Sequence, residues 1–151
     1  MAQSLSRILI HIIFSTKDRF PFLTDRELRK RMHAYLARVF YEHESPAIEV
    51  GGTVDHVHIA CLLSRNYAIC DIIRKAKANS TSWVKSESVG CSIFSWQGGY
   101  GVFSIDPLEI DSVKKHIQGQ EEHHRKLTFQ EEYLEILRKY GMEYDQRYIW
   151  T

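Results

Sequence analysis

Apolar residues recur along the chain with two different periods, and the strand-like runs come first. Residues 5–15 form a nearly continuous apolar and β-branched run that ends at the charged residues 16–19. This is typical of a central strand that is covered on at least one face. Gly51-Gly52 predicts a turn or bulge between two strands, and Gly98-Gly99 predicts a hairpin. The other expected strands cover residues 47–50, 53–63, 93–97 and 100–105.

Apolar residues at spacings of three and four predict helices between these strands. Thr24, with Glu27 three residues later, has the spacing of a capping box, Pro107 marks a helix start, and Gly141 marks a helix end. The expected helices cover residues 24–43, 67–86, 108–122 and 129–140. The aromatic tail beyond them is expected to pack on the body of the protein or on a partner subunit.

The first expected helix has an apolar stripe and a basic outer face. The stripe carries Leu28, Met32, Tyr35, Leu36, Val39 and Phe40. The basic face carries Arg26, Arg29, Lys30, Arg31 and Arg38. The order of the elements, βαββαββαα, predicts a single α+β domain over residues 1–151. We expect an antiparallel sheet with its helices mainly on one face.

Composition narrows the function classes without choosing one. The chain has 44% hydrophobic and 26% charged residues and a formal net charge of +1, so nucleic-acid binding would need a local basic patch. Three cysteines without a C-x-x-C spacing predict free thiols and a reducing compartment. The N-terminal apolar run is too short to span a membrane. We therefore expect a cytoplasmic protein with no membrane partner.

Two histidines lie in the third expected strand. His56 and His58 alternate with Val57, Ile59 and Cys61, so both imidazoles lie on one face, about 6–7 Å apart along the backbone. Such a pair makes half of a metal site or half of a phosphate-binding site. The alternative is two partly exposed strand histidines that are hydrogen-bonded to their neighbours.

The helix expected at 108–122 offers a second half of this site. His116 and Gln120 are four residues apart and share a helix face, which His123 continues. An amide oxygen beside two imidazoles gives a mixed nitrogen and oxygen site that accepts Mg²⁺ or Mn²⁺. The alternative is that Gln120 and His123 cap or solvate the end of the helix.

Several blocks of the sequence resemble one known family. Asp55-His56-Val57-His58 resembles the His-hydrophobic-His motif of the HUH single-strand nucleases. The rest is similar to their single-tyrosine transposases of bacterial insertion sequences and the repeat-associated relatives. The similar blocks are the strand ending near Lys17 and Arg19 and residues 73–80, 96–104, 120–126 and 143–148.

The resemblance implies a ferredoxin-like HUH nuclease sandwich and a specific chemistry. His56, His58 and Gln120 would hold a divalent cation, Mg²⁺ or Mn²⁺, that polarises the scissile phosphate. A tyrosine one turn before the glutamine would attack the phosphate and form a 5′-phosphotyrosine. Members of the family act as dimers on single-stranded DNA hairpins, so a homodimer is expected.

This chain departs from the family pattern at the nucleophile position, which holds His116. Four readings stay open: His116 is itself the nucleophile, nicking is lost while DNA binding is kept, another tyrosine substitutes, or the histidine was introduced in place of the tyrosine. Tyr100 and Tyr133 are the nearest tyrosines by sequence, although both fit packing roles better.

The candidate DNA contacts are basic side chains that would hold phosphates and aromatic rings on which unpaired bases would stack. The basic candidates are Lys17, Arg19, Arg74, Lys77, Lys114, Lys115, Arg125 and Lys126. The aromatic candidates are Trp83, Trp96 and Tyr100, each of which also fits a core position.

Three functions therefore compete. The first is a metal-dependent, dimeric transposase that nicks and rejoins single-stranded DNA by transesterification. The second is a catalytically inactive descendant that binds DNA hairpins in a regulatory or host role. The third is a zinc metallohydrolase built on His56, His58, His123 or His124, for which the sequence shows no carboxylate beside the metal.

Overall fold

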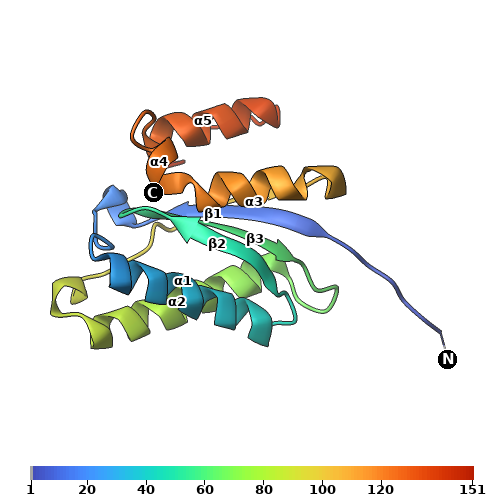
Figure 1. The fold of residues 1–151 in the computed structure, drawn as a ribbon, viewed down its shortest axis with the longest axis horizontal. Coiled ribbons are helices and arrows are strands. Elements are labelled where there is room, and N and C mark those ends of the chain that lie inside the picture. Colours follow the sequence, from blue (N-terminus) through green and yellow to red (C-terminus); the bar gives the residue numbers. More distant parts are fainter. Residues whose placement is uncertain (1) are drawn as a thin grey trace.

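A four-stranded antiparallel sheet forms the centre of the protein (Figure 1). The structure is a computed structural model and describes residues 2–151. The strand order is β2-β3-β1-β4. The strands are β1 (Leu9–Ser15), β2 (Ala47–Gly52), β3 (His56–Leu62) and β4 (Gly101–Ser104).

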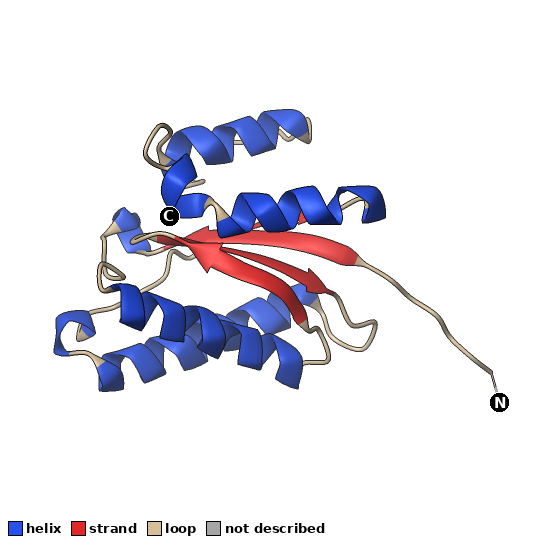
Figure 2. Cartoon of the chain, viewed as in Figure 1, coloured by secondary structure: helices blue, strands red, loops and turns tan. Residues whose placement is uncertain are grey.

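Helices cover both faces of this sheet (Figure 2). One face is covered by α1 (Arg26–Glu42) and α2 (Ile69–Glu87), and the other by α3 (Ile110–Gln118), α4 (Gln120–His123) and α5 (Phe129–Lys139). Short 3-10 turns occur at Lys17–Arg19, Val89–Cys91 and Pro107–Glu109. No helix in residues 2–151 is long and apolar enough to cross a membrane.

The predicted α+β class with an antiparallel sheet is confirmed, and the expected placement of the helices mainly on one face is corrected. The reason lies in β1, where all seven residues are buried. Ile12 and Phe14 pack in the core beneath α1 and α2, whereas Ile13 packs in the core beneath α5. A strand that is apolar on both sides needs a helix layer on each side.

Two predicted elements differ from the observed ones. Residues 93–97 form no hairpin strand, because Trp96 makes a single bridge with Thr16 and buries its ring. Its indole nitrogen donates to Ser80 Oγ at 2.9 Å. The helix expected over 108–122 ends at Gln118 and resumes at Gln120 after Gly119.

The other helix ends lie close to their predicted positions. The first helix is capped by Asp25 rather than Thr24, and its carboxylate accepts from the backbone N–H groups of Glu27 and Leu28. The last helix ends before Gly141, which has a φ of 62°. The aromatic tail packs on the body of the protein as predicted, with Trp150 against the core under α5.

Close contact between β2 and α3 depends on a glycine. A Cβ added at Gly51 would lie 2.4 Å from the backbone oxygen of Ile117. We therefore expect Gly51→Ala to lower the free energy of unfolding by about 1–3 kcal/mol, since α3 must move away from the sheet. Chemical denaturation measures this loss. The control is Gly90→Ala, where the nearest atom would be 3.7 Å away; equal stability of the two variants would contradict the expectation.

Candidate metal centre

The histidine pair of β3 lies on the face of the sheet that α3, α4 and α5 cover. The side chains of His56 and His58 are fully buried, and their ring centroids are 5.2 Å apart. The shared face is therefore as predicted, while the alternative of two partly exposed histidines is wrong.

Gln120 lies beside this pair. Its Oε1 is 2.9 Å from His56 Nε2 and 3.0 Å from His124 Nε2. Its Nε2 donates to Glu132 Oε2 at 3.1 Å and to the backbone oxygen of His116 at 3.2 Å. Since both of these partners are acceptors, they fix the amide with its oxygen toward His56. Gln120 is thus a buried side chain of the centre and does not solvate a helix end.

A buried glutamate from α5 stands in the middle of the centre, and sequence reasoning did not find it. Glu132 Oε1 lies 2.8 Å from His58 Nε2 and 3.2 Å from His124 Nε2. Its Oε2 lies 3.1 Å from both His116 Nε2 and His123 Nε2. One signal in the sequence could have indicated Glu132: it is an acidic residue among the buried positions of α5, which include Phe129 and Tyr133.

Burial and mutual contact set the charges in this cluster. Burial alone would raise the pKa of Glu132, but His116, His124 and His58 around its carboxylate hold that pKa well below its usual range. Burial lowers the pKa of His58 to about 4, against the opposing pull of Glu132. Burial also lowers the pKa of His11, whose Nε2 lies 2.8 Å from His58 Nδ1, to about 2. At neutral pH, the centre therefore has an ionised Glu132 beside a neutral His58 and a neutral His11.

A carboxylate fixes the proton of His56. His56 Nδ1 lies 2.8 Å from Asp55 Oδ1 and 3.0 Å from Thr53 Oγ1. Burial would raise the pKa of Asp55, but its hydrogen bonds with His56 and Thr53 keep it lowered, so the carboxylate accepts the Nδ1 proton. In the tautomer whose only ring proton is on Nδ1, His56 Nε2 is an acceptor and faces Gln120 Oε1, also an acceptor. Two acceptors at this distance fit a bound cation, and Asp55 orients the imidazole as metal sites require.

Two further histidines complete the cluster at its outer side. The Nε2 atoms of His116 and His123 are buried and form no hydrogen bond, although both side chains are about one-third exposed (34% and 35%). A cavity of about 570 Å³ between α3 and α5 reaches His116 and is also lined by His11 and Lys139. The centre is therefore accessible from this cavity.

The predicted DNA-contact residues lie on several elements. Lys17, Lys115 and Lys126 are exposed, and Lys114 is half-buried. The remaining four contact other groups. Arg19 lies over the Trp150 ring, Arg74 pairs with Asp71, Arg125 pairs with Glu122, and Lys77 donates to the backbone oxygens of Gln97 and Gly99.

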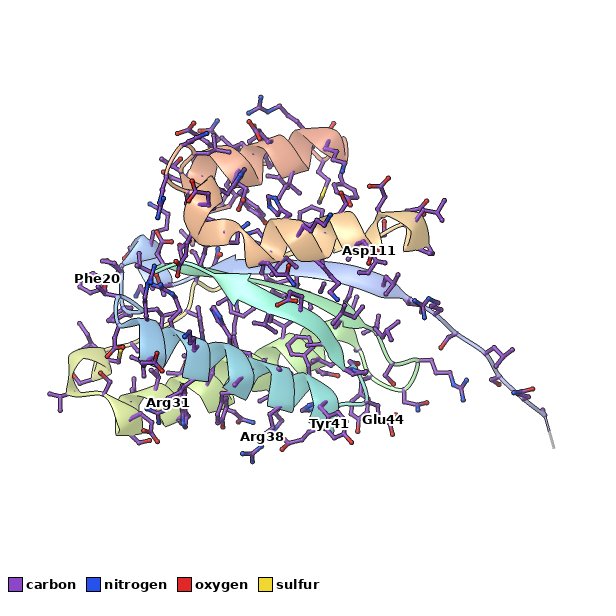
Figure 3. The ribbon with its side chains drawn as sticks, in the orientation of Figure 1. Phe20, Arg31, Arg38, Tyr41, Glu44 and Asp111 are labelled. Atoms are coloured by element: carbon purple, nitrogen blue, oxygen red, sulfur yellow. The ribbon has the colours of Figure 1, made fainter. Side chains whose placement is uncertain are left out.

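The structure also places the aromatic candidates and the basic face expected on the first helix. Trp96 is a core residue, and Trp83 stacks on Tyr35 with 5.0 Å between ring centroids, whereas Tyr100 stays exposed. Arg29 of the predicted basic face is buried and donates to Glu121 and to the backbone oxygen of Leu23. Arg31 and Arg38 do project from α1 away from the sheet (Figure 3).

Tyr133, one of the two tyrosines nearest to His116 in the sequence, packs in the core. Its side chain stacks on Phe129 with ring centroids 5.7 Å apart, and burial raises the pKa of its hydroxyl. A Cβ on Gly101 would lie 2.6 Å from that hydroxyl, so the ring is closely surrounded. Tyr133 is therefore placed as a packing residue, which agrees with the prediction.

The fold and the buried centre define a class: a small α+β domain in which a histidine pair on a sheet meets an amide and a carboxylate from the covering helices. Comparison with known families identifies one family. The family model described as "Transposase IS200 like" matches residues 4–120. The chain belongs to the IS200-like transposase family, which is a family of DNA-transposing enzymes.

Solved structures agree with this assignment at the level of the fold. A candidate transposase from Deinococcus radiodurans R1 is 18% identical with a TM-score of 0.62, over 80% of this chain and 95% of that one. A REP-associated tyrosine transposase bound to a REP hairpin is 12% identical with a TM-score of 0.58, over 82% of this chain and 74% of that one. A search of curated proteins finds no match.

Proposed function

We propose that this protein binds single-stranded DNA at hairpin ends and, with a divalent cation, nicks and rejoins it by transesterification. The observation that carries the proposal is the meeting of His56, His58 and Gln120 on one side of the sheet, within a domain of the IS200-like transposase family. The REP-associated relative is bound to a hairpin, and this supports a hairpin as the ligand.

The residues present fit the cation that this chemistry uses. His56, His58 and Gln120 would hold Mg²⁺ or Mn²⁺, with His124 and Glu132 adjacent. When bound, the cation supplies a Lewis acid that polarises the scissile phosphate and stabilises charge on its oxygens. Asp55 holds the proton of His56 at Nδ1, and His11 fixes the ring of His58. The buried surroundings exclude water from this side of the centre.

His116 occupies the position of the attacking side chain. It is partly exposed, faces the cavity between α3 and α5, and lies next to the proposed cation site. An imidazole there can attack phosphorus through a neutral nitrogen. Lys17, Lys115 and Lys126 are exposed and are proposed to bind phosphates, together with the other basic candidates. The family resemblance supports a homodimer, and the cysteine pattern supports a cytoplasmic location.

The second candidate function is a hairpin-binding protein without nicking activity. Two observations favour it: the attacking position holds an imidazole beside Glu132, and the nearby Tyr133 is buried. The zinc metallohydrolase was disfavoured because the sequence showed no carboxylate at the metal. Glu132 supplies that carboxylate. The experiment below therefore also tests for zinc-dependent hydrolysis.

Incubation with single-stranded hairpin DNA and Mn²⁺, followed by denaturing electrophoresis, separates these functions. Cleaved or rejoined strands, or a covalent protein–DNA band, are expected if the proposed transposase activity is present. His56→Ala is the matched inactive variant, and His43→Ala, which alters a histidine bonded to Val39 outside the centre, is the control. Salt-sensitive binding without new strands supports the hairpin-binding function. Absence of DNA binding together with zinc-dependent hydrolysis of a small substrate supports the third function.

A further inference from the structure

The two oxygens of Glu132 face two different groups of histidines. Oε1 faces His58, His124 and His56, whose Nε2 atoms lie at 2.8, 3.2 and 3.9 Å. Oε2 faces His116 and His123, both at 3.1 Å. The first group contains the strand pair of the proposed cation site, and the second lies outside it. Five imidazoles thus converge on a single carboxylate from two sides.

We propose that His116, His123 and Glu132 form a second metal site, and that Glu132 bridges it to the first. The three ligand atoms, one from each residue, lie within 4.8 Å of one another. Two imidazoles and one carboxylate are a common ligand set for a transition metal that keeps open coordination positions. The inference rests on the proposed function only in that the first site, at His56, His58 and Gln120, holds the partner ion.

The Nε2 atoms of the two histidines have no hydrogen-bond partner in the centre, whereas Glu132 Oε2 also accepts from Gln120 Nε2. His116 Nε2 and His123 Nε2 are buried without a hydrogen bond, although a carboxylate oxygen lies 3.1 Å from each. Ligand atoms at metal distances of about 2.1 Å in an octahedral site lie about 3.0 Å from their neighbours. The spacing of the group therefore fits ligands placed around an ion, and buried polar groups without partners are costly unless something binds them.

The chemistry of the group selects the kind of metal. Two imidazole nitrogens favour Zn²⁺, Mn²⁺ or Co²⁺ over Mg²⁺ and Ca²⁺, which prefer oxygen ligands. The side chain of His116 also lines the cavity of about 570 Å³ between α3 and α5, so the second site adjoins this cavity. In this arrangement, His116 Nε2 binds the second metal and is not the attacking atom, although the family resemblance expects an attacking tyrosine at this position.

Metal stoichiometry tests the proposal without any enzymatic activity. Equilibrium dialysis of the full chain against Mn²⁺, with metal analysis of the retained protein, is expected to give about two ions per chain, since a shared carboxylate holds ions in pairs. His123→Ala and His116→Ala should each give about one ion, because each removes a ligand of the second site alone. His43→Ala should retain both ions, since His43 is bonded to Val39 away from the centre.

Electron paramagnetic resonance of the same samples provides the second readout. Two Mn²⁺ ions about 3.5–4 Å apart are magnetically coupled, so the wild type should show a coupled signal that the His123→Ala and His116→Ala variants lack. One ion per wild-type chain that is lost in His56→Ala would overturn the second site and leave the proposed function standing. No bound Mn²⁺ in the wild type would contradict both. Two ions in both single variants, with the coupled signal kept, would also overturn the second site.

Discussion

A covalent protein–DNA adduct is expected when His116 is replaced by tyrosine and the protein is given hairpin DNA with Mn²⁺. The position lies one turn before Gln120, faces the cavity and is partly exposed, so a phenol there has room to reach a bound phosphate. The tyrosine oxygen would bond to phosphorus while the bond from phosphorus to the 3′ oxygen breaks, which leaves a free 3′-hydroxyl and a 5′-phosphotyrosine. Denaturing electrophoresis would show a protein–DNA band that is stronger than any band formed by the wild type.

His116→Phe is the matched control, because it has nearly the same shape as tyrosine and no hydroxyl. It should bind hairpin DNA as the tyrosine variant does and form no adduct. A tyrosine variant that binds Mn²⁺ and DNA but forms no adduct would show that more than the attacking group has changed. An equal adduct in the wild type would instead identify His116 as the nucleophile.

Glu132→Gln is expected to weaken both the fold and the metal centre. Glutamine has the shape of glutamate but lacks the negative charge, so the hydrogen bond from His58 and the contacts with the other imidazoles are weakened. Loss of a buried hydrogen bond to a charged group costs about 1–3 kcal/mol of unfolding free energy. Added Mn²⁺ should raise the Tm of the wild type by binding only the folded state, and this rise should largely disappear in the variant.

The difference in stability should also depend on pH. The pKa of Glu132 is held below its usual value of 4.5 in the folded protein. The carboxylate therefore stabilises the fold fully above pH 4.5 and progressively less below it, as the unfolded chain takes up a proton. The gap between wild type and variant should be largest near neutral pH and narrow in acid. Denaturation at several pH values measures it.

Glu131→Gln is the control for both measurements. Glu131 is the preceding residue of α5 and is exposed, and its backbone N–H donates to the capping hydroxyl of Thr128. Glutamine serves equally well at this position of a capping box. The control should therefore keep the wild-type stability and the rise in Tm with Mn²⁺. Equal losses of stability and of the Mn²⁺-dependent rise in Tm in both variants would contradict a specific role for the buried Glu132.

Local sequence patterns predicted the two histidines that β3 contributes to the centre. The alternation of His56 and His58 with apolar residues places both imidazoles on one face, and the structure shows this arrangement. The spacing placed Gln120 on one helix face with His116 by treating residues 108–122 as one helix, and only the family resemblance gave Gln120 a place at the metal. The chain breaks at Gly119, and Gln120 reaches the centre from the separate short helix α4.

Glu132 could not be placed because nothing local indicates its partners. It is 74 residues from His58 in the sequence, and only the packing of α5 over the sheet brings the two together. The hairpin expected at 93–97 failed for a related reason. Tertiary packing of the Trp96 ring against Ser80 and Phe14 outweighed the strand preference of an aromatic segment. The second helix layer was not predicted. The apolar run of β1 indicates that the strand is buried, but it does not indicate which helices cover each face.

The placement of Glu132 on α5 has a consequence for biosynthesis. All four strands and α3 are translated before residue 120, whereas the carboxylate that joins the two histidine groups follows later in the chain. While the protein is still being made, the sheet can bring His56 and His58 together before Glu132 is present. The proposed second metal site is thus complete only after the final helix has left the ribosome and docked, so a chain that holds an ion at both proposed sites is also a fully synthesised one.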